Sequence, residues 1–490
     1  MSKKYNFAFL IALPALLVVC MLRLPVVFNG VILPFKQFDM SEGFFGSSWS
    51  GLDNFRILLS IDQNYYALAN TLSINVILLL LIVLSSFIIG MSLSKIKTSW
   101  VYRALCIFIS IPLFIPQMYW VVLFNKIFSM NGWMNASTAE PKFYLGDSEF
   151  VRWLYIIAEV IRWTGVIAAV ISYSVRRAPR RRKLITAFKV EVSIILVSVA
   201  FILITDFELL HPLVNPLIYE RMDTMTLFGV RTGMMIGDIS LSGSVWFIQF
   251  LFCFMVLTVL FLVGRGFIKS SLFPNKEQEL IGITSDQPIY SGRTWTKYIS
   301  TLVYGIYSLI LIIIMLLMAN TVIDQVSHMT NDMFIPSSVV YTILAFITSI
   351  ISVMLSVLLA YPLTGSSTLG KKLYTILLLL FIAAGQFGFN EYFFVSSLGL
   401  KNTYIPIIIT GMFSPVSVIL LATYANQKTA GTPAGFGKYI LSILPAAVVV
   451  LIGSTLLIMD SYTSSYIYMS DPQLLSPTVQ IAKSFSSNSP

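Results

Sequence analysis

Long apolar runs constrain the fold of this chain more than any other feature. Stretches of about 20 residues rich in Leu, Ile, Val and Phe recur along most of the sequence, and an α-helix of ~20 apolar residues is long enough to cross a bilayer. Charged residues make up only 11% of the chain, against 57% apolar residues, which is too little charge to cover a soluble surface. The pattern predicts an all-α polytopic membrane protein.

The apolar runs predict about eleven spanning helices. The first begins after Lys3 and Lys4, as a signal peptide would, but its apolar run is longer than a signal core and shows no small-residue cleavage site. The expected spans lie near residues 6–28, 68–94, 101–124, 151–174, 190–210, 244–264, 301–323, 337–363, 373–388, 404–424 and 439–458.

The distribution of basic residues predicts how these helices are oriented. If the N-terminus is cytoplasmic, about two thirds of the 32 Lys and Arg residues fall on the inner side, as the positive-inside rule requires. The net charge of +10 is therefore interpreted as a topology signal. With eleven spans, the C-terminus is expected outside the cytoplasm.

A polar, turn-rich segment divides the chain into two predicted bundles. Residues 269–297 contain Pro274, Pro288 and Gly292 and read as a cytoplasmic linker. We expect a first bundle of six helices over 1–268 and a second of five over 298–490. Because six helices return the chain to the cytoplasm, both bundles would start with the same orientation, as parallel repeats do.

No catalytic or metal-binding constellation is visible. Cys20, Cys106 and Cys253 lie inside apolar runs, and His211 and His328 are far apart in sequence, so neither a disulfide framework nor a metal centre is expected. No recognisable nucleophile–base set or metalloprotease motif occurs. We therefore expect no catalytic residues, no metal and no cofactor, and not an enzyme.

One pair of charges stands inside an apolar run. Glu159 and Arg162 are three residues apart on one helical face near the middle of an expected span, where lone charges are costly in lipid. One interpretation is an intramembrane ion pair that fixes helix packing. The other is that the pair borders a substrate path and contacts sugar hydroxyls or a gate.

A dense basic run occupies residues 174–183. Taken alone it resembles a nucleic-acid patch, but beside two spanning helices it is typical of a topology anchor that contacts anionic lipid head groups. Docking of a cytoplasmic partner is the alternative. We expect no nucleic-acid partner.

Ordered segments in both halves resemble known permeases. Segments in the first half resemble the larger permease subunit of binding-protein-dependent carbohydrate ABC importers, nearest to the polysaccharide and aldouronate branch: 49–59 (WSGLDNFRILL), 70–72 (NTL), 128–135 (FSMNGWMN) and 143–147 (FYLGD). Segments in the second half resemble the companion subunit of that branch: 358–364 (LLAYPLT), 370–372 (GKK), 397–404 (SLGLKNTY) and 414–420 (SPVSVIL). The likeness covers about 6–265 and 300–482.

This resemblance implies a function and a set of partners. In that family two permeases in the bacterial plasma membrane enclose a sugar path, receive substrate from an extracytoplasmic solute-binding protein and dock cytoplasmic ABC ATPase subunits. The resemblance therefore implies a fused permease importing an oligosaccharide or polysaccharide fragment. It identifies no substrate-binding residues, because no side-chain motif for sugar contacts can be matched here.

The likeness weakens where the family couples transport to ATP. The family's cytoplasmic coupling loop is missing from the first half, where only residues 175–190 join two helices. The second half keeps a remnant of the loop, and its last family helix is missing. The residues expected to contact an ATPase are Gly431, Phe436, Tyr439, Leu444 and Pro445.

The missing loop leaves a second function open. A permease-derived membrane scaffold or sensor subunit without ATP-coupled transport would also have lost its coupling contacts. A membrane enzyme such as a glycan polymerase is disfavoured, because the outer loops show no acid/base pair with recognisable spacing.

Overall fold

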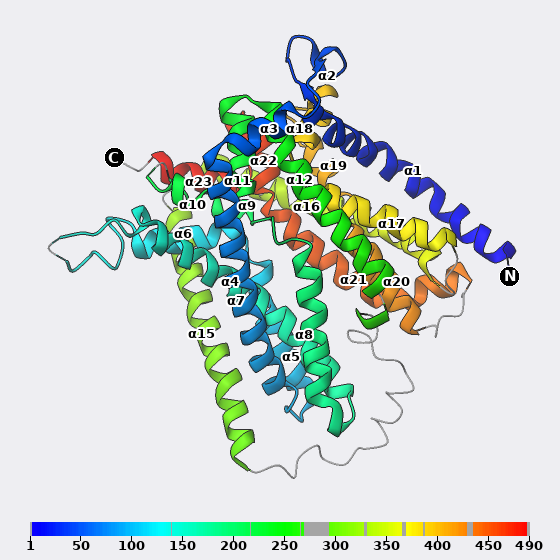
Figure 1. Ribbon diagram of the computed structural model, residues 1–490. Coiled ribbons are helices and arrows are strands. Elements are labelled where there is room, and N and C mark those ends of the chain that lie inside the picture. Colours follow the sequence, from blue (N-terminus) through cyan, green and yellow to red (C-terminus); the bar gives the residue numbers. More distant parts are fainter. Residues whose placement is uncertain are drawn as a thin grey trace.

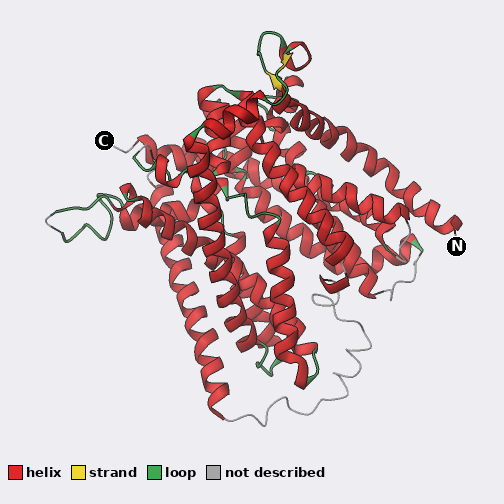
Figure 2. Cartoon of the chain, in the orientation of Figure 1, coloured by secondary structure: helices red, strands yellow, loops and turns green. Residues whose placement is uncertain are grey.

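The computed structural model describes residues 2–138, 140–215, 217–264, 266–268, 294–327, 331–364, 369–385, 388–428 and 435–487. Nearly all regular structure in these ranges is helical (Figure 2). The strands described there form one short antiparallel pair, β1 (Lys36–Gln37) with β2 (Ser48–Trp49). The predicted all-α fold is confirmed.

Seven helical segments in the described ranges are long and apolar enough to cross a membrane. Each coincides with a predicted span, which confirms a polytopic architecture. They are built on α1 (Ser2–Ile32), α4 (Asp62–Leu93), α7 (Ser148–Arg177), α12 (Ile239–Val259), α15 (Thr294–Ser327), α16 (Asn331–Ala360) and α21 (Phe436–Asp460).

Two predicted spans are bent rather than straight. The chain turns by 78° between α5 (Ser99–Ser110), extended by η2 (Ile111–Phe114), and α6 (Gln117–Phe128). Pro116 has no N–H and disfavours the helical conformation of the residue before it, and Ile115 is indeed extended. The continuous helix expected over 101–124 is therefore wrong.

The second bent pair lies in the other half of the chain. There α19 (Ile405–Gly411) and α20 (Pro415–Lys428) meet at 40° across a break that ends at a proline. If each bent pair counts as one span, the described residues contain up to nine membrane-crossing segments.

The remaining two predicted spans are shorter than expected. Helix α8 (Lys183–Val199) has 17 residues and α17 (Leu369–Ala384) has 16. At ~1.5 Å per residue, helices of this length fall short of the ~30 Å hydrocarbon core. The described residues thus contain seven to nine spans rather than eleven.

The expected span 190–210 is wrong in position as well as length. After Val199 the chain leaves the helix, and three of its carbonyl groups accept hydrogen bonds from the side-chain amides of Asn75, which is partly buried, and Gln249, which is buried. The Asn75 amide donates to the carbonyl oxygens of Ile202 and Ile204 at 2.8 and 2.9 Å, and Gln249 donates to that of Leu203 at 2.7 Å. Because buried carbonyls need partners, these amides stabilise a turn where the apolar sequence alone predicts a helix.

Short helices connect the long ones. They are η1 (Leu33–Phe35), α2 (Gly43–Gly46), α3 (Asp53–Ser60), η3 (Tyr144–Gly146), η4 (Arg180–Arg182), α9 (Phe207–Leu210), α10 (Tyr219–Met222), α11 (Met225–Val230), η5 (Arg231–Ile236), η6 (Leu260–Gly264), η7 (Tyr361–Leu363), α18 (Gly388–Ser397), α22 (Tyr462–Tyr468), η8 (Pro472–Leu474) and α23 (Pro477–Ser487).

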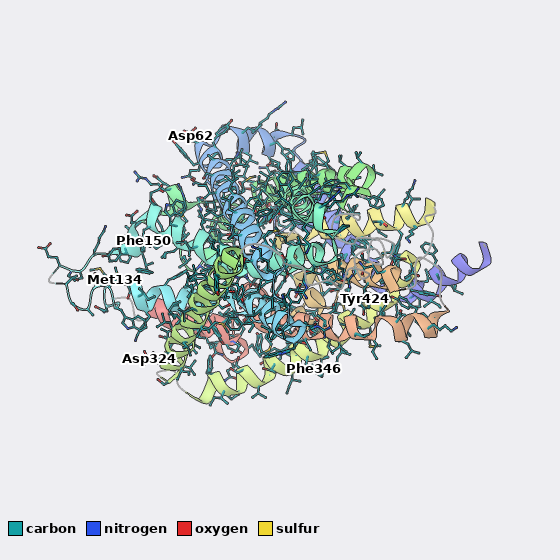
Figure 3. The ribbon with its side chains drawn as sticks, turned by 90° about the horizontal axis from the view of Figure 1, so that it is seen from below. Asp62, Met134, Phe150, Asp324, Phe346 and Tyr424 are labelled. Atoms are coloured by element: carbon teal, nitrogen blue, oxygen red, sulfur yellow. The ribbon has the colours of Figure 1, made fainter. Side chains whose placement is uncertain are left out.

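The opening helix of each predicted bundle packs on the other bundle. Helix α15, which begins the second half, lies against α4 and α6, while α1 lies against α16, α17 and α18 (Figure 1). Viewed from below, Asp324 of α15 lies on the side of Met134 and Phe150, and Tyr424 of α20 lies on the opposite side (Figure 3).

Polar contacts hold the two exchanged helices. Lys95 and Lys126 bind Ser300 and Asp324 of α15, each at 2.6 Å. Arg23 of α1 forms an ion pair with Glu391 of α18 at 2.8 Å. The division at 268 and 298 remains a prediction, because residues 269–293 lie outside the described ranges.

Candidate functional site between the two halves

A buried ion pair on α7 forms the centre of the candidate site. Glu159 and Arg162, which are 3% and 4% exposed, contact each other across one helical turn. Trp163 donates its indole N–H to the other Glu159 oxygen at 3.0 Å. The Arg162 guanidinium also reaches Asp206 at 3.2 Å, so one cation serves two carboxylates.

The bend before α6 extends this network to the second half. The side-chain amide of Gln117 donates to Asp206 at 2.7 Å, and its backbone N–H donates to Asp460 at 2.9 Å. The first N–H groups of a helix have no partner within the helix, and the break at Pro116 makes that of Gln117 available. Asp460, at the end of α21, supplies the acceptor from the other half.

A second carboxylate crosses the same interface. Glu208 of α9 accepts hydrogen bonds from the backbone N–H and the hydroxyl of Thr463 of α22, at 3.2 and 2.7 Å. Nearby, the His211 ring lies 5.0 Å from the Tyr466 ring and bonds the Tyr462 hydroxyl at 3.3 Å. Burial lowers the pKa of His211 to about 4.

The network holds more acid than base. Four carboxylates, Glu159, Asp206, Glu208 and Asp460, surround the single guanidinium of Arg162 in this part of the described structure. Asp460 is 6% exposed, and one of its oxygens is buried without a donor among the described residues. Burial, and the nearby charge of Asp206, raise the pKa of the Glu208 carboxyl.

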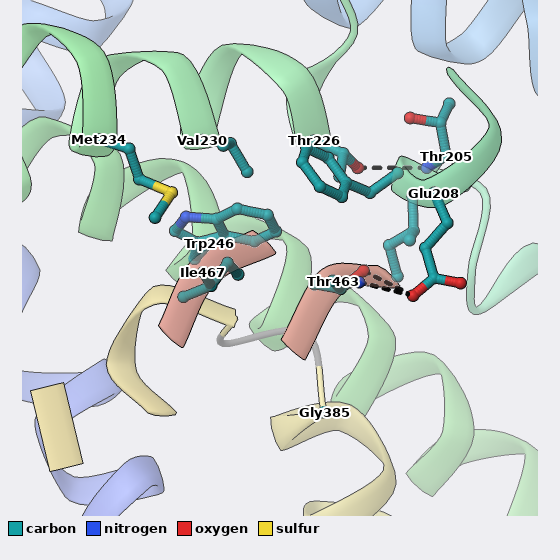
Figure 4. Close-up of a pocket in the computed structure, with 11 residues that line it drawn as sticks. Thr205, Glu208, Thr226, Val230, Met234, Trp246, Gly385, Thr463 and Ile467 are labelled. Carbon is teal, nitrogen blue, oxygen red and sulfur yellow. Dashed lines mark hydrogen bonds between the residues drawn. The ribbon is translucent and has the colours of Figure 1, made fainter. Parts of the chain in front are cut away.

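A cavity of about 250 Å³ adjoins Glu208 where the halves meet. Eleven residues line it (Figure 4). The first half contributes segments from 204 to 246, and the second contributes Gly385, Thr463 and Ile467. The wall is apolar and aromatic, with Phe207 and Trp246, and is interrupted by three threonines and Glu208.

The sequence pattern indicates Glu159 and Arg162, but it does not indicate the other carboxylates of this network. Asp206 and Glu208 lie near the end of the span expected over 190–210, and Asp460 follows the span expected over 439–458, so each resembles a charge at a helix end. Asp460 does stand out in one respect, because it is the first charged residue after Lys438 and ends a long uncharged run. Gln117 is a polar residue directly after Pro116, which also marks the helix break.

Four of the five expected coupling residues lie on α21. Gly431 lies outside the described residues. Tyr439 is 1% exposed and donates its hydroxyl to the carbonyl of Val357 at 2.9 Å, and its ring lies 6.1 Å from that of Phe436. Leu444 is 54% exposed, and Pro445 is the proline inside the helix. In the first half, α7 and α8 are joined by residues 178–182 alone.

No group of three or more His, Cys, Asp or Glu residues in the described ranges is arranged to hold a metal ion. The three cysteines are free thiols.

No family model matches the chain, and no curated protein matches it. Among solved structures, it is similar to a chain of a bacterial alginate ABC transporter in complex with an alginate pentasaccharide-bound periplasmic protein, with 17% identity over 55% of this chain and 96% of that chain and a TM-score of 0.46. A second is a bacterial ABC transporter involved in the import of the acidic polysaccharide alginate, with 16% identity over 54% of this chain and 98% of that chain and a TM-score of 0.45.

Proposed function

We propose that this chain is a fused permease that imports an oligosaccharide or polysaccharide fragment across a bacterial plasma membrane without converting it chemically. The observation that carries the proposal is the ordered pair of permease-like halves, whose segments jointly line one cavity. An apolar cavity with a few convergent polar groups at an interface between bundles is typical of a small-molecule site.

The hydrogen bonds across the interface suit a gate. Glu208 and Asp460 join the two halves through Thr463 and Gln117. Alternating access moves one bundle against the other around a fixed site, so contacts of this kind must break and re-form during each cycle. ABC ATPases on the cytoplasmic side would drive that motion, and an extracytoplasmic solute-binding protein would deliver the sugar.

Reconstitution tests the proposal. The full chain is placed in proteoliposomes with a candidate ABC ATPase and a candidate solute-binding protein from the same organism, and ATP hydrolysis is measured with and without oligosaccharide-loaded binding protein. We expect hydrolysis to rise severalfold with the loaded protein. A well-folded complex whose hydrolysis does not respond would contradict import.

The exposed Leu444 provides a test of coupling. Leu444→Ala is compared with Val449→Ala, a similarly exposed position one and a half turns further along α21. If the predicted contact forms, Leu444→Ala lowers stimulated ATP hydrolysis and ATPase binding, whereas Val449→Ala leaves both unchanged. Equal effects of the two changes would show that Leu444 does not make a specific contact with the ATPase.

The short α7–α8 connection favours a second candidate function. Five residues, 178–182, leave no room for a separate coupling helix, so a scaffold or sensor subunit without ATP-coupled transport is the alternative. It predicts that the purified protein binds no ATPase. Co-purification of an ATPase in stoichiometric amount would count against it.

A further inference from the structure

We infer that the interface cavity takes an uncharged sugar ring and selects against uronates, with Glu208 as the specificity-determining residue. This inference rests on the proposed import function, because it assigns the substrate class of the same cavity. It follows from the charges that line the cavity, from its size and from the fixed position of Glu208.

The cavity contains an acid and no base. Of its eleven lining residues, Glu208 is the one charged side chain, and none is Lys, Arg or His. The nearest cation of the network, Arg162, already contacts Glu159 and Asp206. Arg231, beside the lining residue Val230, pairs with Asp223. None of the residues that line the cavity can therefore form an ion pair with a sugar carboxylate.

The remaining wall suits the faces and hydroxyls of a neutral sugar. Trp246 uses its indole N–H within the protein, donating to Ser242 at 3.2 Å, so its ring serves as an apolar surface. Thr463 holds one Glu208 oxygen in place through two hydrogen bonds, and a carboxylate has further acceptor capacity for sugar hydroxyls. The volume of about 250 Å³ is near the lower end of small-molecule sites, roughly 300–1,000 Å³, and fits one ring.

Glu208 is partly buried, and its carboxylate repels a second anion more strongly than it would in water, because charges interact more strongly where water is partly excluded. A C6 carboxylate in place of a hydroxymethyl group would bring such a charge beside Glu208, with Asp206 and Asp460 also near. Glu208 therefore disfavours uronates while it accepts hydrogen bonds from neutral sugars.

Matched sugars test the inference. Binding of maltotetraose, cellotetraose and mannotetraose to the purified full chain is measured by calorimetry and compared with that of each sugar oxidised to the uronate at every C6. We expect at least one neutral sugar to bind and its oxidised form to bind at least about tenfold more weakly. Equal or tighter uronate binding would overturn the inference and leave import standing. Binding of none of the sugars would count against import itself, and the inference would fall with it.

Variants test whether Glu208 is the residue that makes uronates bind more weakly than neutral sugars. Glu208→Gln should bring the uronate to within about threefold of its neutral partner, whereas Glu220→Gln, an exposed glutamate on α10 outside the cavity lining, should keep the wild-type ratio. Filling the cavity by Ile467→Trp should abolish neutral-sugar binding, and Ile452→Trp on the exposed face of α21 should not. An unchanged ratio in a folded Glu208→Gln protein would refute the assignment.

A pH series on the unmodified chain gives the same information without a variant. Glu208 faces Asp206 of its own turn, Arg162 of α7, Asp460 of α21 and Tyr462 of α22. Because burial raises its pKa, Glu208 loses its charge as the pH falls, while an exposed uronate stays ionised down to about pH 4. The discrimination should therefore shrink with falling pH, and a ratio that stays constant from pH 8 down to the ordinary Glu pKa of 4.5 would oppose the inference.

Discussion

Arg162 is the residue on which the buried network depends most. It contacts both Glu159 and Asp206, so its removal leaves two carboxylates without a cation, whereas removal of Glu159 leaves Arg162 paired with Asp206. Arg162→Ala should therefore lower the free energy of unfolding by about 3–5 kcal/mol, and Glu159→Ala by about 1–3 kcal/mol. Denaturation in detergent would check this order, and the reverse order would show that Asp206 does not share the charge.

His211 should make stability depend on pH. Its pKa falls from the usual 6.5 to about 4 because burial disfavours the charged ring, so the unfolded chain binds more protons than the folded one between these values. The stability that the neutral His211 ring contributes is therefore fully present above about pH 6.5, and it is lost as the pH falls towards 4. At ~1.4 kcal/mol per pKa unit, a shift from 6.5 to about 4 corresponds to a loss of about 3.5 kcal/mol.

The variant His211→Gln isolates this contribution. It removes the titrating ring and keeps a polar side chain beside Tyr462. Thermal unfolding of both proteins in detergent, followed from pH 7.5 to pH 4, should give a shallower decline for the variant. Parallel curves would mean that His211 is already protonated in the folded state.

At the scale of single elements, the sequence predicts where the long apolar helices lie, but it does not predict where α8 ends. The apolar runs locate the long helices, and Pro116 marks the bend between α5 and α6. The end of α8 could not be predicted, because it depends on amides of Asn75 and Gln249 that are far away in sequence. For the same reason the local pattern predicts the contact of Glu159 with Arg162 but not that of Arg162 with Asp206.

Asn75 should therefore be needed for the turn after α8. Asn75→Leu removes the donor to two carbonyls, and leaving buried acceptors unpaired costs roughly 1–3 kcal/mol. Asn125→Leu is the matched control, because Asn125 donates only to the Val121 carbonyl of its own helix. Hydrogen exchange of residues 200–206 should accelerate in the first variant alone. Equal protection from hydrogen exchange in the two variants would mean that water or another group donates hydrogen bonds to the carbonyls of this turn.

At the scale of the whole molecule, the exchanged helices make each half incomplete without the other. The apolar pattern predicts two bundles in sequence order, but it cannot show that α1 packs on α16, α17 and α18 while α15 packs on α4 and α6. The spanning helices all present apolar faces, so the apolar pattern does not distinguish one neighbour from another. The choice of neighbour depends on specific contacts, such as the ion pair of Arg23 with Glu391. Among the described residues, the helix that opens each half therefore packs on the other half.

Separate expression of the halves tests this exchange. Fragments 1–268 and 294–490, produced together with an affinity tag on one, should co-purify as a complex, because each leaves uncovered the face on which the other's opening helix packs. Removing residues 1–35 from the first fragment should lower recovery of the second severalfold. Arg23→Glu should also lower it, and adding Glu391→Arg should restore it, because the reversed pair again joins opposite charges. Full recovery without residues 1–35 would mean that α1 contributes little to holding the halves together, and that the contacts of α12 with α17 suffice.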